Sequence, residues 1–386
     1  MTNFPRFGHS RLADFALDPD VAHLNHGGYG ATPRAVLAAA VAARQQMEAD
    51  PSTFFRRDLI DGLRRAADRV AGFLGGDGKD WAFVENATAG LNAVIASLDL
   101  ERGDEMLCLS QVYGAVGNAM RYCAERRGAR VVTVPVPVPF TDAAPLLQAI
   151  AAAIGRRTRL AVFDHITSTG AVVLPVREMA AICRARGVPV AIDGAHAPGQ
   201  VALDVPALGV DWYVGNLHKW AFAAKGTGVI WCTPERQART HPVAISHNLG
   251  QGFAAEFDYS GTRDNSAWLA VPAALDYIAG FGAEAIEAHN NALAREAGGL
   301  LMAAWGTEAA AGADQRAAMA SIRLPGSPSG DRGAAHKLAL RLRHELGITA
   351  GVMVLEGALW LRVSAQIYNE IGDYERLAAI GKEFAG

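Results

Sequence analysis

Short apolar runs alternate with helix-length amphipathic segments over residues 21–253. Most of these runs are bounded by Gly, Pro, Asn or Asp, as buried strands are. The expected strands are residues 81–84, 105–109, 130–134, 159–164, 188–192, 211–214 and 228–232. Helix-length segments at 88–97, 117–127 and 176–186 separate several of them. Strands that alternate with helices predict βαβ units, and therefore a mainly parallel central sheet with helices on both faces.

The pattern changes after about residue 261. Long helical segments at 268–281, 283–301 and 333–346 surround strand-like segments at 318–323 and 359–363. Residues 324–333 are rich in Pro, Gly and Ser and predict a loop. We therefore expect a large α/β domain over residues 21–260 and a smaller α+β domain built from residues 1–20 and 261–386.

Composition narrows the class of protein. The 386 residues carry a formal net charge of -3 without a dense block of like charge, which argues against a nucleic-acid surface. Residues 1–10 lack the apolar segment of a signal peptide, and no apolar run reaches the roughly 18 residues of a membrane span. Four scattered cysteines without CxxC spacing predict buried thiols and a cytoplasmic location; they are Cys108, Cys123, Cys183 and Cys232.

Lysine is rare in this chain, with five lysines against 31 arginines. A lysine amine can form a Schiff base with an aldehyde, whereas an arginine cannot. Lys219 follows an apolar segment and precedes Trp220, so we expect it to be partly desolvated and its pKa to be lowered. A surface lysine is the alternative. The other lysines are Lys79, Lys225, Lys337 and Lys382.

Two further features accompany Lys219 at predicted strand ends, where α/β sheets bind ligands. Asp193 closes the apolar segment 188–192, although a turn-forming aspartate has the same pattern. Residues 83–88 predict a strand, a polar turn and a helix that begins near Thr88, whose N-terminus could hold a phosphate or simply carry a capping threonine. A carboxylate, an amine and a phosphate cradle together predict a pyridine aldehyde cofactor.

From about His23 to the C-terminus the chain resembles the class V aminotransferase family of fold-type I enzymes that depend on pyridoxal phosphate. Within that family the likeness to isopenicillin N epimerases is greatest. Six motifs in family order carry it: HLNHGGYG (23–30), NATA (86–89), DGAHAPG (193–199), HKW (218–220), GTRD (261–264) and LRVS (361–364). The resemblance implies pyridoxal 5'-phosphate as cofactor, a small amino acid as substrate, and no metal.

The resemblance also implies roles for individual residues. Lys219 would form the Schiff base and move the Cα proton, and Asp193 would pair with the pyridinium nitrogen. Around the ring and phosphate, the implied contacts are Tyr113 by stacking, His196 and Ser168 near the phenolic oxygen, and Ala87, Thr88, Asn216 and His218 at the phosphate. Asn216 departs from the more usual serine, but its amide can still donate a hydrogen bond.

Three implied substrate contacts are Arg362, Asn25 and Tyr29. A guanidinium matches a carboxylate with two parallel hydrogen bonds, although a surface ion pair is the ordinary role of an arginine. Thr262 is implied to reach the phosphate of a neighbouring subunit, so we expect a homodimer.

Loss of the Cα proton can lead to epimerisation, β-elimination or transamination. The resemblance favours an epimerase or racemase, with a C–S β-lyase or an aminotransferase as alternatives. Epimerisation needs an acid/base on each face of the substrate, and Tyr29, His26 or Tyr113 could complement Lys219. A cysteine desulfurase is disfavoured, because the expected loop 347–354 contains no cysteine.

A nucleotide-binding dehydrogenase is the alternative from another class. It would need GxGxxG directly after the first strand and an acidic residue roughly 20 positions later. The glycines at 27, 28 and 30 lead into Ala31, Thr32 and Pro33, so the spacing does not match. A non-catalytic binding protein would have no need of Lys219 and Asp193 together.

Overall fold

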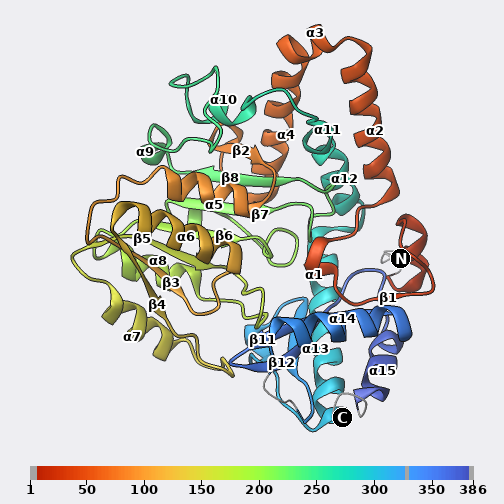
Figure 1. The fold of residues 1–386 in the computed structure, drawn as a ribbon. Helices are drawn as coiled ribbons and strands as arrows, with labels where there is room; N and C mark the ends of the chain where they lie inside the picture. The colour runs from red at the N-terminus through yellow and green to blue at the C-terminus, as the bar shows by residue number, and fades with distance from the viewer. Residues whose placement is uncertain (1–6, 327–329, 382–386) are drawn as a thin grey trace.

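The computed structural model describes residues 7–326 and 330–381, so Lys382 and part of the predicted loop 324–333 lie outside the described residues. A seven-stranded sheet forms the centre of the molecule, in the order β2-β8-β7-β6-β5-β3-β4 (Figure 1). Its strands are β2 (Trp81–Val84), β3 (Glu105–Leu109), β4 (Arg130–Val134), β5 (Thr158–Asp164), β6 (Val190–Gly194), β7 (Trp212–Asn216) and β8 (Gly228–Cys232). Only β8 runs against the rest, which confirms the predicted mainly parallel sheet.

Helices cover both faces of this sheet, because its strands are apolar on both sides. In β2, Trp81 and Phe83 join one core while Ala82 and Val84 join the other. The second core is completed by α5 (Ala87–Ala96), α6 (Gly114–Arg127) and α10 (Phe253–Asp258). The first is completed mainly by α2 (Arg34–Ala49), α4 (Leu59–Leu74), α7 (Ala144–Ala153), α8 (Val176–Arg184) and α12 (Val271–Phe281). The layered α/β architecture is therefore confirmed.

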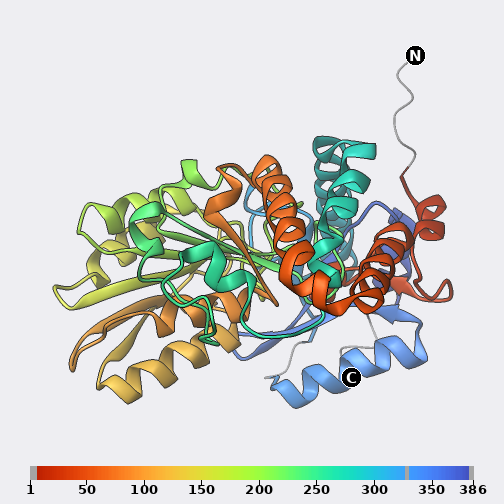
Figure 2. The same cartoon turned by 90° about the horizontal axis from the view of Figure 1, so that it is seen from above.

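A smaller antiparallel sheet of order β11-β12-β9 lies beside the part of the molecule built on the seven-stranded sheet (Figures 1 and 2). It consists of β9 (Met319–Arg323), β11 (Gly351–Leu355) and β12 (Ala358–Ser364), packed with α13 (Ala283–Trp305), α14 (Arg332–Glu345) and α15 (Ile371–Ala379). The prediction of a loop over residues 347–354 is wrong for residues 351–354, which belong to strand β11. There β11 pairs residue by residue with β12, from Gly351 opposite Arg362 to Leu355 opposite Ala358.

The two parts of the chain are joined near both predicted domain boundaries. The short strand β1 (Ala22–His23) pairs in parallel with β10 (Ile348–Thr349), so the chain just before α1 (His26–Tyr29) packs with the C-terminal part. Conversely, α12 packs with the core of the large sheet. The boundaries at residues 20/21 and 260/261 stay a prediction. The remaining α-helices are short: α3 (Pro51–Thr53), α9 (Pro234–Gln237) and α11 (Ser266–Leu269).

The cysteines and the apolar helices bear on two expectations drawn from composition, namely buried thiols and the lack of a membrane span. Cys108, Cys183 and Cys232 are buried and Cys123 is partly buried, and all four are free thiols. No single described helix is both long and apolar enough to cross a membrane. The stretches 266–281 and 283–305 reach that threshold only together, across a bend of 74°.

Candidate active site

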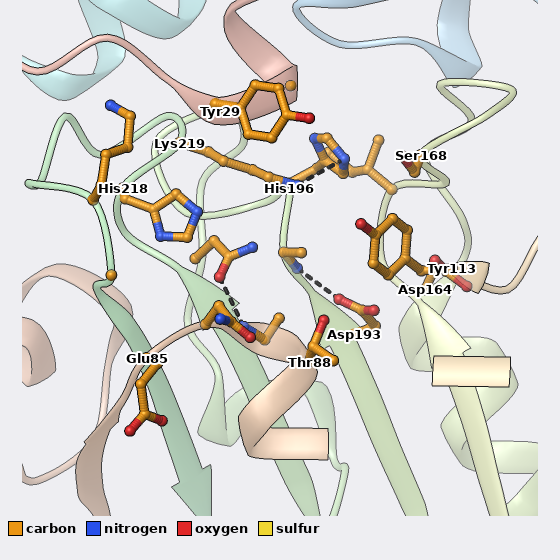
Figure 3. A pocket seen from close by; sticks show the side chains of 18 residues that line it. Tyr29, Glu85, Thr88, Tyr113, Asp164, Ser168, Asp193, His196, His218 and Lys219 are labelled. Carbon is orange, nitrogen blue, oxygen red and sulfur yellow. Dashed lines mark hydrogen bonds between the residues drawn. The ribbon is translucent and has the colours of Figure 1, made fainter. Parts of the chain in front are cut away.

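A cavity of about 670 Å³ lies at the carboxyl ends of β5, β6 and β7 (Figure 3). Each strand contributes a polar residue to its wall: Asp164 from β5, Asp193 from β6 and Asn216 from β7. This edge is where a parallel α/β sheet is expected to bind a ligand. Most predicted site residues line the cavity, namely Tyr29, Ala87, Thr88, Tyr113, Ser168, Asp193, His196, Asn216, His218 and Lys219.

Lys219 places a buried amine in this cavity. Its Nζ lies 3.2 Å from Nε2 of His196. Burial and the charge of Arg362 lower the pKa of Lys219 to about 8, although Asp193 and Asp164 oppose this shift. A Cβ at Gly30, where φ is +71°, would collide with the carbonyl oxygen of His218, so glycine lets α1 approach Lys219 closely. The amine is therefore desolvated and poised to react as a nucleophile.

His196 is the neutral partner of that amine. Burial and the neighbouring charge of Lys219 lower the pKa of His196 well below its usual value. Nε1 of Trp220 donates to Nδ1 of His196 at 3.5 Å, which places the proton of the neutral ring on Nε2. Because Nε2–H faces Nζ, and an amine accepts a hydrogen bond only when unprotonated, the contact favours the reactive form of Lys219.

Asp193 and Asp164 form a pair of buried carboxyl groups. They are paired residues on β6 and β5, and their side chains lie side by side near the ring of Tyr113 (Figure 3). Oδ1 of Asp193 accepts a hydrogen bond of 3.0 Å from the amide of Ala195, whereas Oδ2 of Asp164 has no partner. Burial raises the pKa of both, and the charge of Asp193 raises that of Asp164 further. Asp193 is thus the better anion of the two.

Sequence reasoning missed Asp164. A usable signal was present, because residues 164 and 193 both close predicted neighbouring strands of a parallel sheet. The register that pairs the two positions, however, is visible only in the folded sheet.

The N-terminus of α5 forms a cradle opposite the carboxyl pair. Asn86 caps the helix by accepting a hydrogen bond of 3.0 Å from Ala89, and the hydroxyl of Thr88 faces the cavity (Figure 3). Oδ1 of Asn216 accepts the amide of Ala87 at 2.8 Å, so Asn216 ties β7 to α5 and keeps its NH₂ group for another acceptor. Nδ1 of His218 donates to the carbonyl of Thr227 at 2.9 Å. The hydroxyl of Thr88 and the NH₂ group of Asn216 are donors that suit a phosphate group, whereas the one N–H of a neutral His218 ring is already committed to Thr227.

Arg362 lies behind the cavity wall rather than among its lining residues. It is only 2% exposed, and burial lowers its pKa to about 10, so it stays charged near neutral pH. Nη1 donates to the carbonyl of Ser168 at 2.6 Å and to its Oγ at 3.2 Å, and Nη2 donates to Oδ1 of Asn25 at 3.0 Å. Its Nε has no partner. Ser168 and Asn25 therefore orient the guanidinium.

The three candidates for a second acid/base differ in accessibility. Tyr29 and Tyr113 line the cavity and are 77% and 45% exposed. His26 is buried, with Nε2 3.0 Å from the carbonyl of Lys219 and Nδ1 2.9 Å from the hydroxyl of Tyr368. Both nitrogens of His26 are engaged away from the cavity, so it is a poor proton donor or acceptor for a bound substrate.

Thr262 does not reach the cavity of its own chain. It is exposed, and its hydroxyl lies 3.2 Å from that of Tyr259. Its implied contact with a neighbouring subunit, and the homodimer, remain predictions.

A desolvated lysine, a carboxylate at the end of the central strand and a helix N-terminus are the three features that pyridoxal phosphate requires. Their arrangement at one sheet edge defines a fold-type I enzyme that uses this cofactor. The chain matches the family Aminotransferase class-V over residues 26–377, and it belongs to that family. The dehydrogenase alternative fails, because residues 26–29 form the short helix α1 after β1, outside the central sheet.

Relatives with different reactions cover nearly the whole chain. It is 36% identical to the putative L-cysteine desulfhydrase 1 of Oryza sativa subsp. japonica, over 92% of this chain and 82% of the relative. It is 33% identical to the isopenicillin N epimerase of Streptomyces clavuligerus, over 94% of each chain. The solved cystine C–S lyase C-DES has the same fold, with a TM-score of 0.79, 22% identity and coverage of 98% and 100%.

The lowered pKa of Lys219 makes capture of the cofactor dependent on pH. Because only the neutral amine attacks an aldehyde, we expect the rate of covalent capture by the apoprotein to rise with pH and to level off above a midpoint near 8. Stopped-flow measurement of the visible absorbance band tests this. A midpoint near 10.5, the ordinary value for lysine, would show that the amine is not desolvated.

Proposed function

We propose that this enzyme removes the Cα proton of a small amino acid and then eliminates a sulfur substituent from Cβ, as an L-cysteine desulfhydrase does. The observation that supports it best is the buried, desolvated amine of Lys219 in the cavity, set against the exposure of Tyr29 and Tyr113, the two lining residues considered as a second base. β-Elimination needs one such base at Cα, whereas epimerisation by two bases needs a second.

Pyridoxal phosphate, when bound, supplies a ring that withdraws electrons from the Cα of an attached amino acid. In our proposal Lys219 holds the cofactor and then accepts the Cα proton. Asp193 would keep the proton on the ring nitrogen, and His196 would contact the phenolic oxygen. Tyr113 would stack on the ring. Thr88 and Asn216 would donate hydrogen bonds to the phosphate, and Ala87 and His218 would complete its pocket.

The substrate carboxylate would bind Arg362. Its guanidinium is already oriented by Ser168 and Asn25, and its unpartnered Nε leaves donor capacity. Binding would require the carboxylate to reach past Ser168 or to replace one of the present hydrogen bonds. Tyr29 would cover the substrate from α1.

A persulfide-forming desulfurase is less suitable. None of the four cysteines lines the cavity, and burial raises the pKa of each thiol. A thiolate nucleophile within reach of a substrate sulfur is therefore missing. The elimination needs none, because the sulfur leaves as a thiolate.

Epimerisation is the second candidate, and sequence likeness had placed it first. Tyr29 and Tyr113 both have hydroxyl groups at the cavity, and either could return a proton to the face away from Lys219. Similarity to isopenicillin N epimerases supports this candidate as well. Epimerisation ranks behind β-elimination, because both ring nitrogens of His26 are hydrogen-bonded away from the cavity and both tyrosines are exposed.

The products distinguish these reactions. The holoenzyme is incubated in deuterated water with L- and D-forms of cysteine, cystine, alanine and serine, with Lys219→Ala as the control. Elimination from L-cysteine consumes one water and yields pyruvate, ammonia and hydrogen sulfide in equal amounts. Deuterium at Cα with inversion would instead support epimerisation, and a cofactor converted to its amine form would support transamination. Either result without sulfide from the thiol substrates would overturn the proposed elimination.

Arg362→Ala is expected to raise KM for the amino acid by about tenfold to a hundredfold, because it removes charge-assisted hydrogen bonds to the carboxylate. The visible band of the bound cofactor should persist, since Arg362 does not contact the cofactor in our proposal. Arg323→Ala is the matched control, because Arg323 lies on the adjacent strand β9 and its side chain is solvent-exposed. An unchanged KM for Arg362→Ala would refute the carboxylate role.

We also propose a homodimer in which Thr262 of one subunit approaches the phosphate of the other. The exposure of Thr262 on a single chain is compatible with such a contact. Sedimentation equilibrium of the holoenzyme should give twice the chain mass of 40.7 kDa. A monomer of full activity would contradict the proposal.

A further inference from the structure

A second lysine lines the active-site cavity. Lys225 lies between β7 and β8 and, with Gly226, lines the same cavity as Thr88, Asn216 and His218. Neither the proposed cofactor contacts nor the proposed substrate contacts include Lys225. It remains accessible to solvent, so a bound group can approach its ammonium.

The structure holds the Lys225 side chain in a defined position. Oγ1 of Thr32 donates its proton to the carbonyl of Ala223 at 3.1 Å. The hydroxyl oxygen can therefore accept a hydrogen bond, and Nζ of Lys225 lies 3.2 Å from it. No carboxylate among the described residues forms an ion pair with Lys225, so two of its three N–H groups are free for another acceptor.

The phosphate cradle lacks a formal positive charge without Lys225. Thr88 and Asn216 are uncharged, and burial lowers the pKa of His218 to about 4, which leaves its imidazole neutral near pH 7. The amine of Lys219 is used in the covalent link. Glu85 also lines the cavity, and it forms an ion pair with Arg263, so the charge of Arg263 is already matched. A phosphate monoester carries a charge of about -1.5 to -2 at pH 7 and is held more strongly by a cation than by neutral donors.

We propose that Lys225 supplies the positive charge that holds the phosphate of the cofactor. Lys225 lies on the loop between β7 and β8, seven residues after His218, and both residues line the cavity. Arg362, by contrast, comes from β12 and does not line it. Partial desolvation lowers the pKa of Lys225 itself, and a neighbouring phosphate would favour its charged form. The proposal rests on the cofactor, not on which reaction follows.

A comparison of two ligands tests this role without measuring turnover. Full-length apoprotein is titrated with pyridoxal phosphate and, separately, with pyridoxal, which has the same ring and aldehyde but no phosphate. Lys225→Met, which keeps the aliphatic stem, is expected to weaken pyridoxal phosphate binding by about tenfold and to leave pyridoxal binding unchanged. Lys225→Arg should retain most of the phosphate preference, and Lys337→Met on the exposed face of α14 is the control.

Each alternative outcome has a distinct pattern. Equal losses for both ligands in Lys225→Met would mean that Lys225 supports the fold of the cavity, and would overturn the proposal. Unchanged affinity for both would overturn it as well, and would leave Lys225 free to bind an anionic substrate. Wild-type protein that binds neither ligand would instead count against the cofactor assignment itself. Inorganic phosphate should compete with pyridoxal phosphate less effectively in Lys225→Met than in wild type.

Discussion

Lys219→Ala is expected to lower turnover by about 10⁴-fold or more, because it removes both the attachment point of the cofactor and the base that accepts the Cα proton. The variant should still bind pyridoxal phosphate through the α5 cradle and Asp193, but its visible spectrum should be that of the free aldehyde. Steady-state rates and absorbance spectra of the purified variant measure both effects.

Two controls make this result specific. Lys337→Ala removes an exposed lysine from α14 and should leave rate and spectrum unchanged. External methylamine should restore a shifted absorbance band to Lys219→Ala, because a free amine can occupy the emptied position. Substantial residual turnover in Lys219→Ala without added amine would exclude Lys219 as the essential base.

Asp193→Ala should reduce turnover by at least about 100-fold, because the ring nitrogen loses the anion that keeps it protonated. Asp193→Asn preserves the shape but not the charge and should show a similar loss. Agreement between the two variants would identify the charge, rather than packing, as the cause. Covalent capture of the cofactor by Lys219 should survive in both, as measured by the visible band. A near-normal rate in Asp193→Asn would refute this role.

Strand positions and the two principal site residues could be predicted from sequence because their causes are local. Strands buried on both faces are continuous apolar runs, and β2, β3 and β8 lie where those runs do. Asp193 and Lys219 each follow such a run, so their place at the sheet edge follows from the strand direction alone. The strand at Gly351–Leu355 was harder to predict from sequence, because β11 is stabilised by pairing with β12 rather than by its own hydrophobic pattern.

The missed residues depend on contacts between distant segments. Asp164 becomes informative only when the register sets it beside Asp193. Lys225 looked like any other lysine until Thr32, 193 positions earlier, was found to hold its amine. His26 looked available in sequence, yet packing turns it toward Tyr368. The expected contact of Thr262 with a second chain stays a prediction, since in a single chain its hydroxyl lies beside that of Tyr259.

In our proposal one amine, that of Lys219, carries the cofactor. The most direct measurement is borohydride reduction of the holoenzyme followed by peptide mass mapping, since reduction makes the link permanent. We predict loss of the visible band and one pyridoxyl phosphate adduct per chain on the peptide that contains Lys219. An adduct on Lys225, the other lysine of the cavity, or a protein that shows neither band nor adduct, would show that Lys219 does not carry the cofactor.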